Sequence, residues 1–411
     1  MSKNVPFWIC CQLGAREHYA IPRALHQAGK LAHLITDVWV LPHSPINWFP
    51  KPLFGHLRDR VHPDLTETSV HDFTPSLIRF ELGQRLQKTS GWQLTIARNN
   101  WFQRQAIQVL DTITPQLNSC PILFSYSYAA LELFRYAKSK GWYTILGQID
   151  PGLVEEQLVL EEHTRYPSSQ STWQPAPPHY WTRWNEECSL ADRILVNSLW
   201  SSQALQQVGI PVNKIDIIPL SYEPPEQASN FVRTYPLIFS AERPLRVLFL
   251  GQVILRKGII AILEAAELLR DQPIEFWFVG SPGFTKLQLD KKNNQLRWIG
   301  SVPRSATADY YQQADVFLFP TLSDGFGLTQ LEAQAWKLPI IVSRFCGEVV
   351  KDGVNGIIVQ EVTGEAIANA LQFCLNNPQQ LEVFAKASTN LSCFSLSQLH
   401  HHLQSLTHAI I

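Results

Sequence analysis

The chain has 411 residues, with 34 lysines and arginines against 35 aspartates and glutamates, and a formal net charge of -1 at pH 7. This length is sufficient for two domains, each with its own hydrophobic core. The balanced charge excludes the strongly basic surface typical of nucleic-acid-binding proteins, so no nucleic-acid partner is expected.

Cysteines and apolar runs indicate the compartment in which the protein is expected. Seven cysteines are an odd number without metal-ligand spacing, and Cys10 and Cys11 are adjacent in a predicted buried strand. This pattern favours reduced thiols in a cytoplasmic protein. No signal-peptide pattern opens the chain, and no apolar run is long enough to span a bilayer. The thirteen tryptophans are compatible with sugar stacking and equally with core packing.

The first half of the chain alternates short apolar segments with segments of helical periodicity. Such alternation predicts an α/β domain with a parallel sheet, in which ligands bind beyond the carboxyl ends of the strands. The predicted strands cover residues 6–11, 31–36, 121–126, 143–146, 191–198 and 214–219, and the predicted helices cover 16–28, 80–110, 129–140, 179–190 and 198–207.

Three residues that follow predicted strands of this half are acceptor-side candidates. Gly14 follows the first strand, where an ordinary tight turn explains it equally well. Gln148 and Asp150 follow the strand at 143–146, at an edge of the sheet suited to contact with an acceptor or a donor sugar. For Asp150, a turn in which its side chain bonds its own backbone is the more common arrangement.

Residues 41–64 are rich in proline, aromatic and basic residues and show no clear periodicity. This segment is compatible with an acceptor-site lining, with peripheral contact to a membrane surface, or with a long surface loop that has buried anchors. A stretch with proline, serine and glutamate at 221–243 is interpreted as the interdomain linker. We therefore expect a first domain at 1–222, a second domain at 223–390 and a C-terminal helix at 391–411.

The second half repeats the alternation of strands and helices, which predicts a second parallel sheet. Its predicted strands cover residues 245–250, 274–279, 296–299, 316–319, 340–343 and 357–359. Helices are predicted after Gly258, over 307–313 and 328–337, from Glu348 as one short helix, and over 366–375, 378–389 and 394–411.

Three loops of the second half would lie on the same edge of its parallel sheet. Arg256 and Lys257 follow the first strand, residues 280–283 follow the next, and the turn at 321–327 follows a later one. Two cations beside a helix N-terminus form a site suited to a diphosphate.

Two carboxylates accompany the turn at 321–327. Asp324 lies within it and Glu332 lies in the helix that follows, and both can accept hydrogen bonds from sugar hydroxyls. Gly325 and Gly327 allow close approach of the backbone to a ligand. Taken singly, the residues of this site also fit a solvated Arg-Lys pair, an N-cap aspartate and a surface glutamate. Their order and spacing together favour a nucleotide-sugar site.

This pattern resembles the retaining glycosyltransferases of family 4, or glycosyl transferases group 1, which have the GT-B fold. Their motif is two acidic residues separated by seven residues in a strand–EGFGL–helix context, and residues 324–328 with Glu332 fit its order and spacing. The likeness extends to the phosphate loop at 251–258, to the end of the first domain at 191–219 and to the turn at 347–356. It is weak before residue 191.

The resemblance implies an α/β GT-B fold, in which two facing Rossmann-like domains with parallel sheets enclose an interdomain cleft and the C-terminal helix crosses back to the first domain. It also implies transfer of a sugar from a UDP- or GDP-sugar donor, with retention of configuration, to a glycan, lipid-linked or small-molecule acceptor. No metal or other cofactor is implied, because arginine and lysine neutralise the diphosphate. The implied catalytic residues are Arg256, Lys257, Asp324 and Glu332, and the implied donor-binding residues are Gly251, Gln252, Gly280, Ser281, Ser323, Gly325, Phe326, Gly327 and Leu328.

Two positions depart from the family pattern. Gln252 stands where the family usually has arginine, and Asp324 stands where it usually has glutamate, whose side chain is one methylene longer. These departures leave open a non-catalytic partner protein that retains the GT-B shell. The fold itself leaves a second alternative open, a nucleotide-sugar epimerase.

Overall fold

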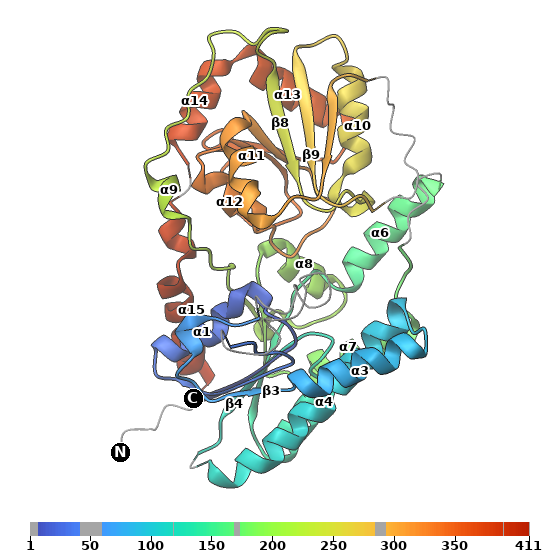
Figure 1. Ribbon diagram of the computed structural model, residues 1–411, viewed down its shortest axis with the longest axis vertical. Coiled ribbons are helices and arrows are strands. Elements are labelled where there is room, and N and C mark those ends of the chain that lie inside the picture. Colours follow the sequence, from blue (N-terminus) through green and yellow to red (C-terminus); the bar gives the residue numbers. More distant parts are fainter. Residues whose placement is uncertain are drawn as a thin grey trace.

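The computed structural model describes residues 7–41, 60–117, 119–167, 173–283, 293–388 and 390–410. It contains two α/β domains, which lie one above the other in Figure 1 with the second domain at the top. Most of the segment at 41–64, for which membrane contact is one hypothesis, lies outside the described residues.

The first domain is built on a parallel seven-stranded sheet with the order β3-β2-β1-β4-β5-β6-β7. The strands are apolar because helices cover both faces of such a sheet. The order reverses between β1 and β4, so a crevice opens beyond their carboxyl ends. The strands are β1 (Trp8–Gln12), β2 (Leu31–Thr36), β3 (Val70–Asp72), β4 (Ile122–Tyr126), β5 (Tyr143–Gly147), β6 (Arg193–Val196) and β7 (Ile215–Ile217), and the main helices are α1 (Ala20–Gln27), α3 (Thr74–Leu86), α4 (Gly91–Ile113), α5 (Leu131–Ser139), α6 (Leu153–Arg165), α7 (Pro178–Leu190) and α8 (Leu199–Gln207).

The second domain is built on a parallel six-stranded sheet with the order β10-β9-β8-β11-β12-β13. Its order reverses between β8 and β11, which opens the corresponding crevice. The strands are β8 (Leu245–Leu250), β9 (Ile274–Val279), β10 (Leu296–Gly300), β11 (Val316–Phe319), β12 (Ile340–Ser343) and β13 (Gly356–Val359), and the helices are α9 (Glu226–Ser229), α10 (Ile259–Leu268), α11 (Thr307–Gln313), α12 (Thr329–Ala335), α13 (Gly364–Asn376) and α14 (Pro378–Lys386). The C-terminal helix α15 (Leu396–Ile410) follows this domain.

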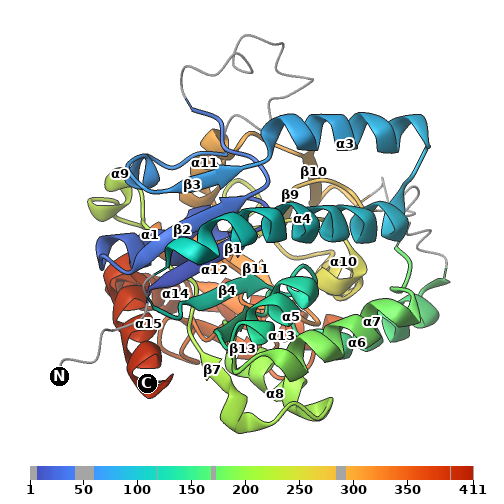
Figure 2. The same ribbon diagram turned by 90° about the horizontal axis from the view of Figure 1, so that it is seen from below.

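Two segments connect the domains. The C-terminal helix α15 packs beside α1 of the first domain, as Figures 1 and 2 show, with Leu399 and Leu403 buried against it. Trp8 Nε1 of β1 donates a hydrogen bond to Thr407 Oγ1 of α15 at 3.3 Å. The stretch at 221–243 is docked on the second domain, because Arg233 is 7% exposed and donates hydrogen bonds to backbone carbonyls there.

Three predicted helices differ from the observed ones. The helix predicted from residue 16 becomes α-helical only at Ala20, because residues 17–19 have left-handed φ angles of 50° to 59°. The helix predicted over 80–110 consists of two helices, α3 and α4. The short helix predicted from Glu348 is wrong: residues 347–351 are irregular, and the Glu348 carboxylate instead accepts a hydrogen bond from the Leu199 amide of the first domain at 3.0 Å.

Candidate active site

The carboxyl-end loops of the two sheets face each other and touch. A Cβ atom added at Gly325 would lie 2.4 Å from the carbonyl oxygen of Ile149, in the loop after β5. Nearby, Trp200 Nε1 on α8 donates a hydrogen bond to Ser323 Oγ at 3.0 Å. A Cβ at Gly327 would lie 2.5 Å from the Phe319 ring of the same domain. Both glycines therefore allow close packing within the protein. Because the loops of the two domains are in contact, the two crevices form one interdomain site.

Arg256 and Lys257 project from the turn that follows β8. The turn ends at Gly258, which has a φ of 72° and where a Cβ would lie 2.0 Å from the Pro320 carbonyl oxygen. Because only glycine fits this position, the turn is held against the end of β11. Arg256 Nη1 then donates a hydrogen bond to the Ser323 carbonyl at 2.8 Å. The structure thus brings the predicted cations to the predicted acidic turn.

Asp324 forms ion pairs with both cations. Its Oδ2 pairs with Lys257 Nζ and lies 3.6 Å from Arg256 Nη1, while its Oδ1 accepts a hydrogen bond from the Phe326 amide at 3.2 Å. Burial disfavours the charged form of Asp324, but Lys257 and Arg256 outweigh this effect and lower the pKa of the carboxyl. An ionised Asp324 therefore offsets part of the positive charge that the two cations offer.

Glu155 is a further site residue, which sequence reasoning missed. It lies near the start of α6 in the first domain, and its Oε2 is 3.3 Å from Arg256 Nη1 of the second domain. Burial raises the pKa of Glu155 to about 7, although the attraction of Arg256 acts in the opposite direction. Its sequence carries no distinguishing signal, because α6 contains four glutamates that look alike (LVEEQLVLEEHTR).

Glu332 lies in the first turn of α12, where a buried neighbour orients it. The Tyr311 hydroxyl on α11 donates a hydrogen bond to Glu332 Oε2 at 2.8 Å, and Tyr311 is 1% exposed. Burial and the charge of Glu332 raise the pKa of Tyr311 well above its usual value, so this hydroxyl stays protonated and acts as a donor. Sequence reasoning identified Glu332 but not Tyr311.

The glycine-rich ends of β8 and β9 pack directly on each other. A Cβ at Gly280 would lie 1.8 Å from the Gly251 carbonyl oxygen, and the Val253 amide donates a hydrogen bond to the Ser281 carbonyl at 2.9 Å. The side chain of Gln252, where the resemblance to family 4 implies an arginine, is exposed at this edge. At this part of the site, backbone groups and the Gln252 amide side chain are available to contact a ligand beside the two cations.

Of three other candidates, two have structural surroundings and the third lines a separate cavity. The Gly14 amide donates a hydrogen bond to Asp37 Oδ1 at 2.9 Å, which ties its turn to the loop after β2. Phe326 is 2% exposed and its ring packs against Phe394 with a centroid separation of 5.9 Å. Leu328 lines a separate cavity of about 210 Å³ between the domains.

Asp150 and Gln148 belong to one hydrogen-bond network in the loop after β5. Asp150 Oδ1 accepts hydrogen bonds from the Tyr128 hydroxyl at 2.6 Å, from Gln148 Nε2 at 3.0 Å and from the Gly152 amide at 2.9 Å. Gln148 is 2% exposed, and its Oε1 accepts a hydrogen bond from Trp184 Nε1 at 2.9 Å. Asp150 therefore forms the expected turn and also lines a cavity, whereas Gln148 supports it from within.

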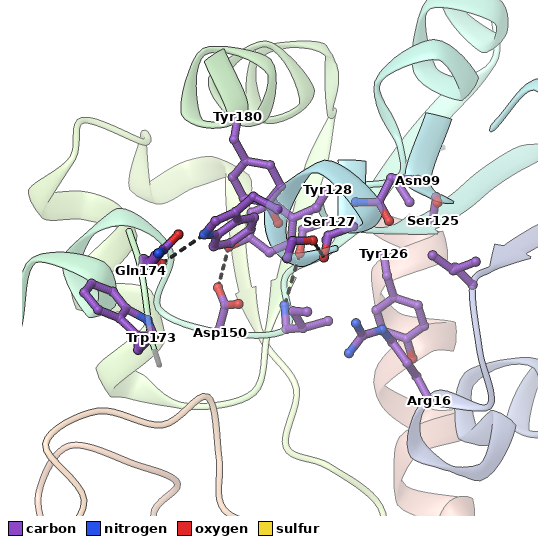
Figure 3. A pocket seen from close by; sticks show the side chains of 16 residues that line it. Arg16, Asn99, Ser125, Tyr126, Ser127, Tyr128, Asp150, Trp173, Gln174 and Tyr180 are labelled. Carbon is purple, nitrogen blue, oxygen red and sulfur yellow. Dashed lines mark hydrogen bonds between the residues drawn. The ribbon is translucent and has the colours of Figure 1, made fainter. Parts of the chain in front are cut away.

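Two cavities share a wall at this loop. The larger has a volume of about 460 Å³ and extends between the loops after β1 and β4, as Figure 3 shows. The smaller has a volume of about 180 Å³ and reaches Glu155 and Arg256. Both are lined by the same five residues: Trp92, Tyr128, Asp150, Trp173 and Tyr180. Sequence reasoning did not assign this aromatic wall.

In the part of the chain that the structure describes, no group of three or more His, Cys, Asp or Glu side chains is arranged to hold a metal ion. None of the helices described there combines the length and apolarity needed to cross a membrane. All seven cysteines are free thiols.

Comparisons with known proteins identify the second domain. Residues 238–391 match the family model for glycosyl transferases group 1. The D-inositol 3-phosphate glycosyltransferase of Geodermatophilus obscurus is 30% identical over 164 residues, which cover 36% of each protein. The amylovoran biosynthesis glycosyltransferase AmsK of Erwinia amylovora is 26% identical over 192 residues, which cover 43% of this chain and 45% of AmsK. The chain thus spans less than half the length of these two relatives.

Solved structures extend the likeness in fold over almost the whole chain. Anabaena Alr3699/HepE in complex with UDP has a TM-score of 0.62 at 13% identity, covering 98% of this chain and 100% of HepE. Sucrose-phosphate synthase from Thermosynechococcus elongatus has a TM-score of 0.65 at 18% identity, covering 98% and 99% of the two chains. The predicted α/β GT-B architecture is confirmed. The chain therefore carries a glycosyl transferases group 1 domain at residues 238–391, and its two Rossmann-like domains together form the GT-B fold.

Proposed function

We propose that the protein is a retaining glycosyltransferase that moves a sugar from a UDP- or GDP-sugar to an acceptor held by the first domain. The observation that carries this proposal is the cluster of Arg256, Lys257 and Asp324 at the point where the strand order of the second sheet reverses. The group 1 domain and the glycosyltransferase names of the relatives support it.

Each charged residue has a role that fits its surroundings. Arg256 and Lys257 bind the diphosphate, and Glu332, held by Tyr311, accepts hydrogen bonds from the two ribose hydroxyls. Asp324 accepts a hydrogen bond from a hydroxyl of the transferred sugar. UDP is the first nucleotide to test, because the similar HepE structures contain UDP, UDP with glucose, and UDP-glucose.

In the proposed reaction, the bond between the anomeric carbon and the diphosphate oxygen breaks, and the diphosphate leaves with the electron pair. The acceptor oxygen forms its bond on the same face of the sugar and gives its proton to a phosphate oxygen. Arg256 and Lys257 stabilise the charge that develops on the leaving diphosphate. Because these cations supply the positive charge, we propose that no metal is required and that EDTA leaves transfer unchanged. We also propose a cytoplasmic location.

The two departures from the family pattern then affect rate and donor choice. Without an arginine at position 252, the phosphate groups have one fewer cation, and the shorter Asp324 is drawn toward Lys257. A donor whose sugar hydroxyl reaches Asp324 in that position would be preferred.

A donor screen that measures release of the nucleoside diphosphate from UDP- and GDP-sugars tests the proposal. Lys257→Ala and Glu332→Ala should each reduce transfer by roughly a hundredfold or more, by loss of a charge contact to the leaving group or of the ribose contact. Lys386→Ala, at an exposed position on α14, is the control. Near-normal activity of both site variants would contradict the site assignment.

The two alternatives predict different results in the same screen. Conversion of a nucleotide sugar into an isomer without any acceptor would favour an epimerase. Absence of calorimetric binding of both UDP and GDP would favour a non-catalytic partner. Retention is checked by NMR of the anomeric proton in the product.

A further inference from the structure

We propose that the acceptor is a neutral carbohydrate, one sugar ring of which binds against the aromatic wall of the larger first-domain cavity. The aromatic wall is defined here as Trp92, Tyr128, Trp173 and Tyr180. This inference rests on the proposed function, because it names the class of acceptor for that reaction.

The wall is rigid before any ligand binds. The Tyr128 and Tyr180 rings stack with centroids 4.9 Å apart, and the Trp92 ring lies 4.8 Å from that of Tyr180. The Tyr128 hydroxyl is fixed by Asp150, and Trp92 Nε1 donates a hydrogen bond to the Gln174 carbonyl at 2.9 Å. Figure 3 shows Tyr128, Trp173 and Tyr180 gathered on one side of the cavity. A preorganised wall costs little conformational entropy on binding.

Aromatic walls suit the faces of sugar rings. One face of a pyranose carries C–H groups whose hydrogens are weakly positive, and the face of an aromatic ring is weakly negative. The hydroxyl groups of the sugar then point outward around its edge, where they require polar partners. The cavity volume of about 460 Å³ is within the range typical of small-molecule sites.

Polar groups are present opposite the wall. Ser125 is 1% exposed and lines the cavity, and its hydroxyl has no hydrogen-bond partner among the described residues. A buried hydroxyl without a partner costs free energy, and rotation of the Ser125 side chain toward the cavity would let a ligand hydroxyl supply that partner. The side chains of Asn99 and Arg16 also line this part of the cavity (Figure 3). The Asp150 carboxylate accepts its hydrogen bonds from described residues on Oδ1. Its other oxygen, Oδ2, can therefore accept a hydrogen bond from a ligand hydroxyl.

Charge and lining favour a neutral sugar over the other acceptor classes. Arg16 and Asp150 contribute one charge of each sign to the cavity, so an anionic acceptor gains little. Among the described residues, only Leu13, Ala129 and Ile149 contribute aliphatic side chains to its lining, which is too few to enclose an alkyl chain. The smaller cavity shares the aromatic wall and has Arg256 in its lining, so this wall lies between the larger cavity and the proposed position of the diphosphate.

Saturation-transfer NMR tests this inference on the full chain with UDP present. The probes are glucose, galactose, mannose, N-acetylglucosamine and their neutral disaccharides at millimolar concentration, with a sugar phosphate and an alkyl glycoside for comparison. We expect saturation of ring C–H protons of at least one neutral sugar, and roughly three- to tenfold weaker binding in Tyr180→Ala. Tyr180→Phe keeps the ring and should retain binding.

Tyr143→Ala is the matched control, because Tyr143 is 45% exposed at the start of β5, at the opposite end of the sheet from the cavity. Unchanged binding in folded Tyr180→Ala, no saturation of any neutral sugar, or saturation of the alkyl chain alone would overturn the inference. UDP calorimetry separates the two proposals: if UDP binds while neutral sugars do not, only the acceptor inference fails. If neither UDP nor GDP binds, the proposed function fails.

Discussion

Glu155 provides the sharpest test of the charge arrangement at the interdomain site. It lies on the first domain and its carboxylate contacts Arg256 of the second domain at 3.3 Å, at the position where a donor diphosphate is proposed to bind. Replacing Glu155 with glutamine removes this negative charge and keeps a similar shape. We expect Glu155→Gln to bind a UDP-sugar more tightly than the wild type above pH 7, and with less dependence on pH.

The magnitude follows from the pKa of about 7 that burial imposes on Glu155. A phosphate bound to the same guanidinium would lie roughly 5 Å from the carboxylate, and two negative charges at that distance repel by about 3 kcal/mol at an effective dielectric constant of 20. Protonating Glu155 at pH 8 costs only about 1.4 kcal/mol, which is less than this repulsion. We therefore expect Glu155 to take up a proton when the phosphate binds. Glu155 is protonated below its pKa, so wild-type affinity should be highest there and fall about tenfold between pH 6 and pH 8.

Other charged groups facing Glu155 are Arg256, Asp324 and Asp150. Arg256 stays protonated throughout this range, and the cations hold the pKa of Asp324 below its usual value, so neither titrates between pH 6 and pH 8. The ligand should be UDP-glucose, because its diphosphate is esterified at both ends and carries no group that titrates near pH 7.

Calorimetry in buffers with different ionisation enthalpies measures both the affinity and the number of protons taken up. The wild type should take up close to one proton at pH 8, and Glu155→Gln should take up close to none. Glu161→Gln, at an exposed position on the same helix, is the control. The reasoning is refuted if Glu155→Gln binds no tighter than the wild type at pH 8 and keeps the same pH dependence.

Three further substitutions test other contacts. Tyr311→Phe removes the hydrogen bond to Glu332, so donor KM should rise roughly fivefold with little change in Tm; an unchanged KM would count against an orienting role. Gly325→Ala places a Cβ 2.4 Å from the Ile149 carbonyl oxygen, so the two domains should move apart and kcat/KM should fall about tenfold or more. Small-angle scattering that shows no change in shape would contradict this expectation. Arg233→Ala leaves buried carbonyls without a donor and should destabilise the second domain by about 3 kcal/mol in denaturant unfolding; a loss below about 1 kcal/mol would show that water replaces the guanidinium.

Much of the fold could be predicted because its strands are short, continuous apolar runs. The residues predicted for β2, β9, β11 and β12 are those observed, since a strand buried on both faces needs no long-range information to be recognised. Helix starts were less predictable. Local periodicity gives no signal for the left-handed backbone at residues 17–19. Nor does it encode the contact of Glu348, in the irregular segment at 347–351, with the distant Leu199 amide.

By itself, the sequence determined the parallel-sheet architecture and the meeting of Arg256, Lys257 and Asp324, because the carboxyl ends of parallel strands share one edge. Only the tertiary structure decided what surrounds them. Glu155 reaches Arg256 across 101 positions of sequence, and Gly325 closes against the first domain. The aromatic wall likewise joins side chains from α4, α7 and two loops. Such contacts arise from the docking of separate elements, which side-chain periodicity does not record.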